Sequence, residues 1–115
     1  MEIRIIKEKI SSDEFRQIAE DNFGDMVKAV VDVKKQIMAV DGDLHSDEEA
    51  LLIENGSKQQ DLWGINIYPD KKDEDWIEFN SMINIKPLQD NRSSEVISPK
   101  TRKRIIEIVG NLVEK

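Results

Sequence analysis

The sequence predicts an α+β fold in which helices pack on one face of a mainly antiparallel sheet. Two observations support this class. Short β-branched runs alternate with amphipathic segments, and several of these runs follow one another closely enough to form hairpins. The expected element order is β-α-β-β-α-β-β-α. With 115 residues, the chain has the size of one ordinary domain, so we expect a single domain over residues 1–115.

The first expected strand is the isoleucine-rich run over residues 3–6. A capping box follows, in which the Ser11 hydroxyl accepts a backbone hydrogen bond while the Glu14 carboxylate reaches back. Apolar residues then recur at helical spacing, which predicts a helix over residues 12–23. Gly24 stands where a left-handed residue commonly ends a helix.

The middle of the chain predicts a hairpin and a second helix. The hairpin comes from β-branched runs over residues 26–33 and 37–40, although its turn lacks the Asn-Gly or Asp-Gly pair of a tight hairpin. A second capping box, from Ser46 to Glu49, predicts a helix of about ten residues that ends at Gly56.

Two further strands are expected over residues 62–68 and 76–86. Their odd positions are mostly apolar, whereas Asn66, Glu78 and Asn84 occupy even positions. Alternate side chains of a strand point to opposite faces. One face of this hairpin is therefore expected to be apolar and the other to be lined with amides.

The last expected helix begins at Ser98 and Pro99, because proline at the first helical position loses no hydrogen bond. Its apolar residues recur with helical period up to Leu112 and predict one buried stripe. Its first turns are basic, which opposes the helix dipole. Three interpretations stay open for this cluster: a solvated face, a site for an anion or RNA, or a surface that pairs with the acidic part of a second copy. The cluster consists of Lys100, Arg102, Lys103 and Arg104.

Composition excludes several classes of protein. The net charge of −7 argues against nucleic acid as a partner, because phosphate affinity comes mainly from lysine and arginine. The absence of cysteine excludes disulfides, thiolate metal sites and thiol nucleophiles. Apolar runs are too short to span a membrane, and the first residues lack the profile of a signal peptide. We therefore expect a cytoplasmic protein that needs no metal or cofactor.

The acidic stretch from Asp41 to Glu49 holds the only histidine of the chain. Two interpretations stay open for it. His45 could act as a general base oriented by Asp47, with Asp43 binding a ligand. Alternatively, the acidic residues only complement the dipole at the start of a helix. A zinc site is disfavoured, because zinc in enzymes usually takes two or three nitrogen ligands.

The amide-lined face also has more than one interpretation. Asparagine is depleted in strands, so Asn66 and Asn84 on one face need a reason. The face could be the polar floor of a ligand site, a solvated surface, or a surface covered by another subunit. If it is a ligand site, we expect Arg92 to pair with an anionic group of the ligand.

Four segments of the chain resemble a family of small prokaryotic proteins classified as a domain of unknown function. The resemblance covers almost the whole chain and implies a self-contained domain, but it implies no activity, cofactor or catalytic residue. The segments are Gly42–Leu52 (GDLHSDEEALL), Leu62–Pro69 (LWGINIYP), Met82–Ile85 (MINI) and Asn91–Ser93 (NRS).

The sequence favours a binding domain for a small polar or anionic ligand or for a protein partner. Two alternatives belong to other classes: a small hydrolase or transferase that uses His45 with an adjacent carboxylate, and an obligate homodimeric interaction module. The ligand hypothesis requires the imidazole of His45, the amides of Asn66 and Asn84, and the guanidinium of Arg92 to share one cavity.

Overall fold

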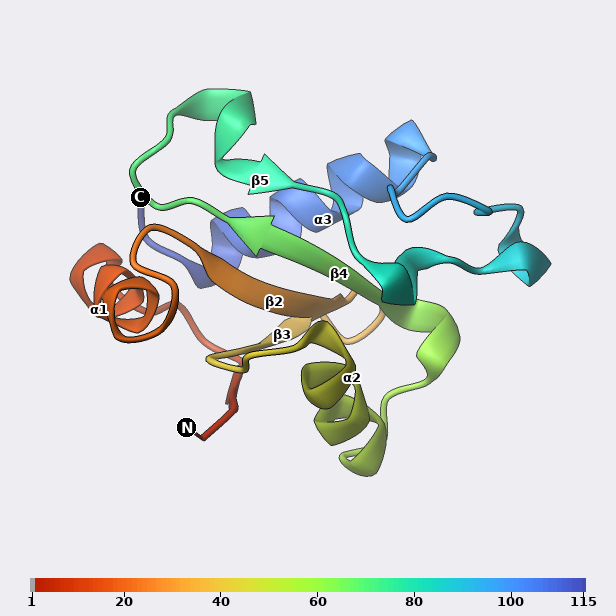
Figure 1. Ribbon diagram of the computed structural model, residues 1–115, viewed down its shortest axis with the longest axis horizontal. Helices are drawn as coiled ribbons and strands as arrows, with labels where there is room; N and C mark the ends of the chain where they lie inside the picture. Colours follow the sequence, from red (N-terminus) through yellow and green to blue (C-terminus); the bar gives the residue numbers. More distant parts are fainter. Residues whose placement is uncertain (1) are drawn as a thin grey trace.

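The computed structural model describes residues 2–115, apart from the side chains of residues 73 and 74. Within this range, five strands form one antiparallel sheet in the order β1-β3-β2-β4-β5 (Figure 1). The long strands β2 and β4 lie side by side at the centre, with Val30 opposite Gly64. The strands are β1 (Arg4–Ile6), β2 (Val27–Asp32), β3 (Ile37–Val40), β4 (Leu62–Ile67) and β5 (Ile77–Glu78).

Three α-helices cover the sheet, and the predicted α+β class is confirmed. They are α1 (Ser12–Asn22), α2 (His45–Glu54) and α3 (Pro99–Leu112). The placement of one helix differs from the expectation that all of them pack on one face. Helices α1 and α3 cover one face, whereas α2 packs on the other, because its Leu52 is buried against Val30, Ala39 and Leu62. Short 3₁₀ helices occur at Gln59–Asp61, Asp73–Trp76, Met82–Asn84 and Pro87–Gln89.

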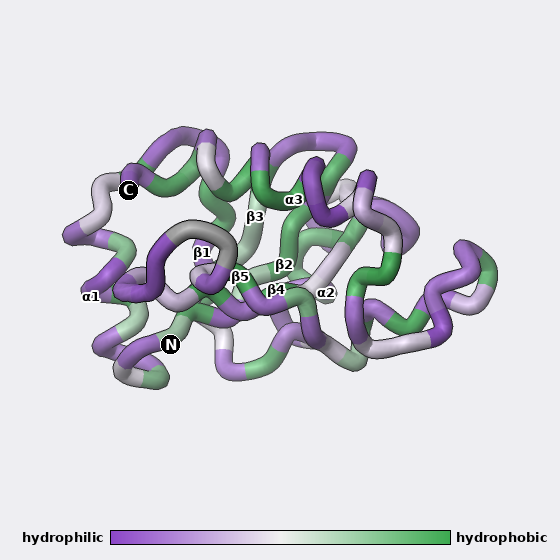
Figure 2. Tube along the Cα trace, turned by 90° about the horizontal axis from the view of Figure 1, so that it is seen from above, coloured by the Kyte–Doolittle hydropathy of each residue, from purple (hydrophilic) through white to green (hydrophobic). Residues whose placement is uncertain are grey.

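The main core lies between the sheet and the pair α1 and α3. Phe15 of α1 and Ile105 and Ile108 of α3 meet the odd-numbered residues of β2 and β4 there. Figure 2 shows apolar strands at the centre, with α3 turning its apolar side toward them and its polar side outward. Both faces of the central strands are thus buried over much of their length, so β4 is buried at every position from Leu62 to Ile67.

Two of the three predicted helix starts are correct. The Ser11 hydroxyl accepts a hydrogen bond from the Glu14 backbone at 3.1 Å, and Gly24 has a φ of +92° after α1. The Glu14 carboxylate does not reach back to complete the capping box, because it accepts a hydrogen bond from Arg4 at 3.0 Å. The Ser98 hydroxyl caps α3 in the same way. The capping box predicted from Ser46 does not form, because the N-cap residue of α2 is Leu44, two positions earlier, which makes no side-chain cap bond.

The strand predicted over residues 76–86 is mostly wrong, because β5 ends at Glu78. The chain then turns through a 3₁₀ helix (Met82–Asn84) that Ser81 caps. Gly64 lets this turn approach the sheet closely, since a Cβ at Gly64 would lie 2.6 Å from the Ser81 Cβ atom. The edge of β4 beyond β5 is therefore covered by a turn instead of a strand. Among residues 2–115, no helix has the length and apolar composition needed to cross a membrane.

Candidate functional site

His45 lies in the first turn of α2, and only 8% of its surface is exposed. Its Nε2 atom lies 2.8 Å from the Ile65 carbonyl oxygen. Because a carbonyl only accepts hydrogen bonds, Nε2 must be the protonated nitrogen. Burial lowers the pKa of the imidazole, and the nearby Lys28 ammonium lowers it further, while the bond to Ile65 acts in the opposite direction. His45 is therefore a neutral residue that attaches α2 to β4.

Glu48, one turn further along α2, is completely buried. Its Oε2 atom accepts a hydrogen bond from the Gly42 backbone at 3.1 Å. Burial raises the pKa of this carboxyl group to about 9, so Glu48 is a neutral acid at pH 7. The sequence interpretation missed this role, because it placed Glu48 among the acidic residues that complement the dipole at the start of the helix. Leu52 was the available signal: it lies four residues later, on the same helical face, and points inward.

Asn66 lies on the same face of the sheet as α2. Its Nδ2 atom donates to the Glu78 carboxylate at 2.8 Å. The residue opposite Asn66 on the neighbouring strand β2 is Lys28. His45 binds the carbonyl of the preceding residue, Ile65. The structure therefore places His45 and Asn66 on one face, close to a lysine and a glutamate.

Asn84 is also completely buried, but the chain itself uses its amide. The Oδ1 atom accepts from the Gly64 backbone at 2.8 Å, and Nδ2 donates to the Gly64 carbonyl at 2.9 Å and to the Ser94 carbonyl at 3.1 Å. The Asn84 amide thus makes the hydrogen bonds to the Gly64 backbone that a neighbouring strand would otherwise make. Because Asn84 has no exposed surface, the structure does not gather the predicted site residues around one open cavity. The remaining three, Asp43, Asp47 and Arg92, are exposed.

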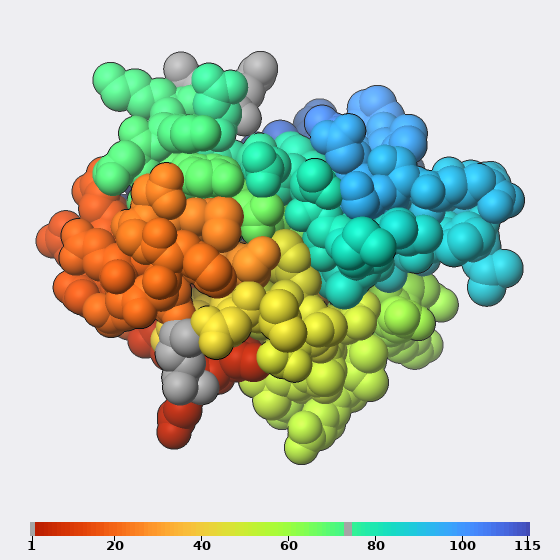
Figure 3. All heavy atoms as spheres, in the orientation of Figure 1, coloured from red at the N-terminus to blue at the C-terminus, as the bar shows by residue number. Residues whose placement is uncertain are grey.

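Residues 85–92 form a projecting segment, here called the arm, at the edge of the molecule (Figures 1 and 3). Backbone hydrogen bonds between Lys86 and Asn91, of 2.6 and 3.1 Å, close its base. Asp90, with a φ of +58°, makes the turn. The buried Asn91 side chain donates to the carbonyls of Asn84, Ser93 and Glu95 and accepts from the Ile97 backbone. The arm is therefore a well-ordered element.

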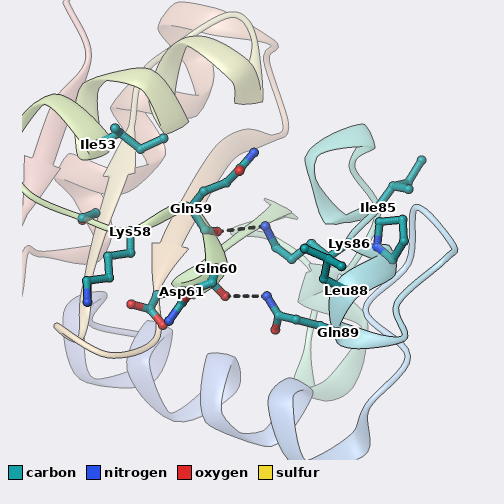
Figure 4. A pocket seen from close by; sticks show the side chains of 11 residues that line it. Ile53, Lys58, Gln59, Gln60, Asp61, Ile85, Lys86, Leu88 and Gln89 are labelled. Carbon is teal, nitrogen blue, oxygen red and sulfur yellow. Dashed lines mark hydrogen bonds between the residues drawn. The ribbon is translucent and has the colours of Figure 1, made fainter.

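A groove of about 950 Å³ lies between the arm and the connection from α2 to β4 (Figure 4). Two hydrogen bonds span its floor. The Lys86 Nζ atom donates to the Gln59 carbonyl at 2.9 Å, and the Gln89 side chain donates to the Gln60 carbonyl at 3.0 Å. These bonds hold the arm at a fixed distance from the connection, so the groove is built into the fold.

Lys86 is the buried charged group of the groove, with 8% of its surface exposed, whereas Lys58 and Asp61, which also line the groove, are more exposed. Its Nζ atom lies 5.3 Å from the centre of the Trp63 ring. Burial lowers the pKa of the Lys86 ammonium, whereas the Glu49 and Asp61 carboxylates raise it. Lys86 therefore stabilises the base of the arm through one carbonyl bond and one cation–π contact.

The rim of the groove is apolar and exposed. Leu88 is fully exposed at the tip of the arm, and Ile85 and Ile53 are each exposed by about two fifths (40% and 44%) on opposite walls. Met82, three residues before Ile85, is exposed by 76%. The sequence interpretation assigned no helix or strand to residues 87–97, between the last expected strand and the last expected helix, and missed this surface. Leu88, an apolar residue within that stretch, was a local signal for it.

The groove offers amide and carbonyl groups at its floor, one buried ammonium and an apolar rim. Among the described residues, no group of three or more histidine, aspartate or glutamate side chains is placed to hold a metal ion.

The fold and the groove thus define a small α+β domain with an ordered arm. The chain belongs to the family described as protein of unknown function (DUF5674), whose model matches residues 4–112. This confirms the resemblance to a domain of unknown function. No curated protein and no solved structure matches the chain.

Proposed function

We propose that this protein is an interaction module that binds an apolar segment of a partner protein in the groove beside the arm. The observation that carries the proposal is the full exposure of Leu88 on an ordered arm. Burying such a side chain contributes about 1.5–3 kcal/mol. An exposed apolar cluster on a soluble domain often marks an interaction site.

The order of the arm supports this proposal. Asn91 and the Lys86–Gln59 bond fix the arm before any partner binds. A preformed surface loses little conformational entropy on association, so more of the burial energy is retained as affinity. Leu88 and Ile85 are therefore presented in a conformation that is ready to bind.

The hydrolase or transferase alternative gains no support from the geometry. A general base must reach the proton that it abstracts. The His45 Nε2 atom is engaged by the Ile65 carbonyl, and the adjacent Asp47 is exposed to solvent. We therefore propose no reaction for His45.

Photo-cross-linking tests the proposal. Benzoylphenylalanine is placed at position 88 and, as a matched control, at position 20, which is an exposed glutamate of α1. Each protein is irradiated in an extract of its native host, with and without an excess of the unlabelled wild-type chain. We expect one saturable adduct from position 88 only, and unlabelled Leu88→Asp should fail to compete for it.

The mass of the adduct identifies the partner. Twice the mass of the chain would assign a second copy, and any other single mass would assign a different protein. Equal labelling from positions 88 and 20, or competition by Leu88→Asp as strong as that of the wild type, would contradict the proposal.

A further inference from the structure

A second cavity, of about 540 Å³, lies between α3 and the start of β4. The Gln89–Gln60 hydrogen bond separates it from the groove, since both residues line both spaces. Its apolar lining comes from Val33 and the buried Trp63 ring. This volume lies within the range of roughly 300–1,000 Å³ that is usual for small-molecule sites.

Three basic side chains of α3 line this cavity: Lys100, Lys103 and Arg104. These cations lie in the first turns of α3, near the positive end of the helix dipole, and therefore oppose it. The first turn carries no acidic residue that would compensate for them. They also take no part in the two ion pairs found among the described side chains. The first turns of α3 are thus strongly basic, although the net charge of the chain is −7.

The neighbouring Arg102 shows that the cluster has two roles. Its Nε atom donates to the Val96 carbonyl, and its guanidinium lies 4.8 Å from the centre of the Phe79 ring. Arg102 is therefore a packing residue. Lys103 and Arg104 have no such described bond and face the cavity, so their charges are available to a ligand.

The lining defines the class of ligand. Arginine and lysine pair strongly with phosphate and carboxylate groups. Val33 and Trp63 offer an apolar surface beside these cations. Asp61 and Glu107 also line the cavity, so its three cations and two carboxylates sum to +1, which favours a single anionic group over a long polyanion such as nucleic acid. The lining therefore suits a compact ligand with one anionic end.

We propose that this cavity binds a small organic anion. Its phosphate or carboxylate group pairs with Lys103 and Arg104, and its apolar body lies against Val33 and Trp63. This cavity shares Gln60, Asp61 and Gln89 with the partner groove, but the cations and the apolar surface of the proposed site come from α3, Val33 and Trp63.

Nuclear magnetic resonance tests this site directly, because the chain has two tryptophans and so two indole signals. The probes are phenyl phosphate, inorganic phosphate and phenol. We expect phenyl phosphate to shift the Trp63 indole signal saturably and to leave the Trp76 signal in place. Because each half of the ligand contributes, inorganic phosphate alone and phenol alone should bind about tenfold more weakly or worse.

Variants assign the binding to the proposed residues. Lys103→Gln/Arg104→Gln should weaken phenyl phosphate about tenfold or more, because charge-assisted hydrogen bonds are lost. Lys7→Gln/Lys9→Gln, which removes the same charge from exposed residues before α1, should bind as the wild type does. The double α3 variant has to keep its dispersed amide spectrum.

Three results would overturn the proposal: no saturable shift at Trp63, equal affinity for inorganic phosphate and phenyl phosphate, or wild-type binding by the folded α3 variant. The Leu88→Asp protein separates this site from the partner groove. It should bind phenyl phosphate normally, so failure of one proposal does not imply failure of the other.

Discussion

Replacing Glu48 by glutamine should stabilise the protein at neutral and alkaline pH. The carboxyl group of Glu48 is fully buried beneath α2 and accepts a hydrogen bond from the Gly42 backbone. A glutamine carbonyl can keep that bond, and its shape is close to that of the protonated acid. The substitution therefore removes the ionisation of Glu48 with little change in packing.

The magnitude follows from the pKa. Folding raises the pKa of Glu48 from 4.5 to about 9, so the folded state holds a proton that the unfolded state has released at pH 7. The interval from 4.5 to pH 7 is 2.5 units, and each unit corresponds to about 1.36 kcal/mol. Glu48 thus destabilises the folded state by at most about 3 kcal/mol at pH 7, relative to acid conditions.

The pKa of Glu48 also fixes the direction in which stability changes with pH. Between 4.5 and about 9, the folded state binds more protons at Glu48 than the unfolded state does, so this group makes stability fall as pH rises. Urea denaturation of the wild type and Glu48→Gln at about pH 5, 7 and 8.5 measures the effect. The advantage of the variant should be small near pH 5 and grow with pH. A variant that is less stable at every pH would refute the assignment of Glu48 as a neutral acid.

Three further predictions concern the fold. Asn84→Ala should lower the free energy of unfolding in urea by about 2–4 kcal/mol, since it leaves two backbone groups of Gly64 unpaired; a loss below about 1 kcal/mol would contradict this role. Gly64→Ala should lower the melting temperature measured by circular dichroism, because the new Cβ atom meets Ser81 at 2.6 Å; an unchanged melting temperature would show that this approach is not tight. In a Glu48→Gln background, stability should fall as pH drops below 6.5, because the unfolded state protonates His45 before the folded state does. His45→Gln should remove that slope, and a slope that persists would assign it to another group.

Local sequence patterns predicted the helices and strands that are determined by residues close to them in the sequence. The serine caps of α1 and α3 depend on residues within one turn, so both helix starts could be read from Ser11 and Ser98. The prediction of a strand over residues 76–86 was mostly wrong, because the course of this segment depends on Gly64. The missing side chain of Gly64 allows the turn at Ser81 to pack against β4. Alternation of apolar and polar residues within the segment cannot indicate this contact, because Gly64 lies far from Ser81 in the sequence.

For the candidate sites too, the sequence predicted what depends on neighbouring residues and missed what depends on contacts between distant ones. Alternation along β4 correctly placed Asn66 on one face with Glu78, and the structure adds His45 to that face. Asn84 was assigned a ligand role because it was assumed to lie in a strand. The burial of Lys86 depends on the Gln59 carbonyl, 27 positions earlier, so no local pattern could indicate it.

The central claim is that Leu88 on the ordered arm is the main contact with a partner protein. Competition for the cross-link at position 88 tests it most directly: one measures the concentration of unlabelled chain that halves the adduct, for the wild type and for Leu88→Asp. Burial of a leucine contributes about 1.5–3 kcal/mol, so the variant should need about tenfold more protein or worse. Its free energy of unfolding should stay within about 0.5 kcal/mol of the wild type, because the side chain is exposed. If both proteins compete at the same concentration, the arm is not the binding surface.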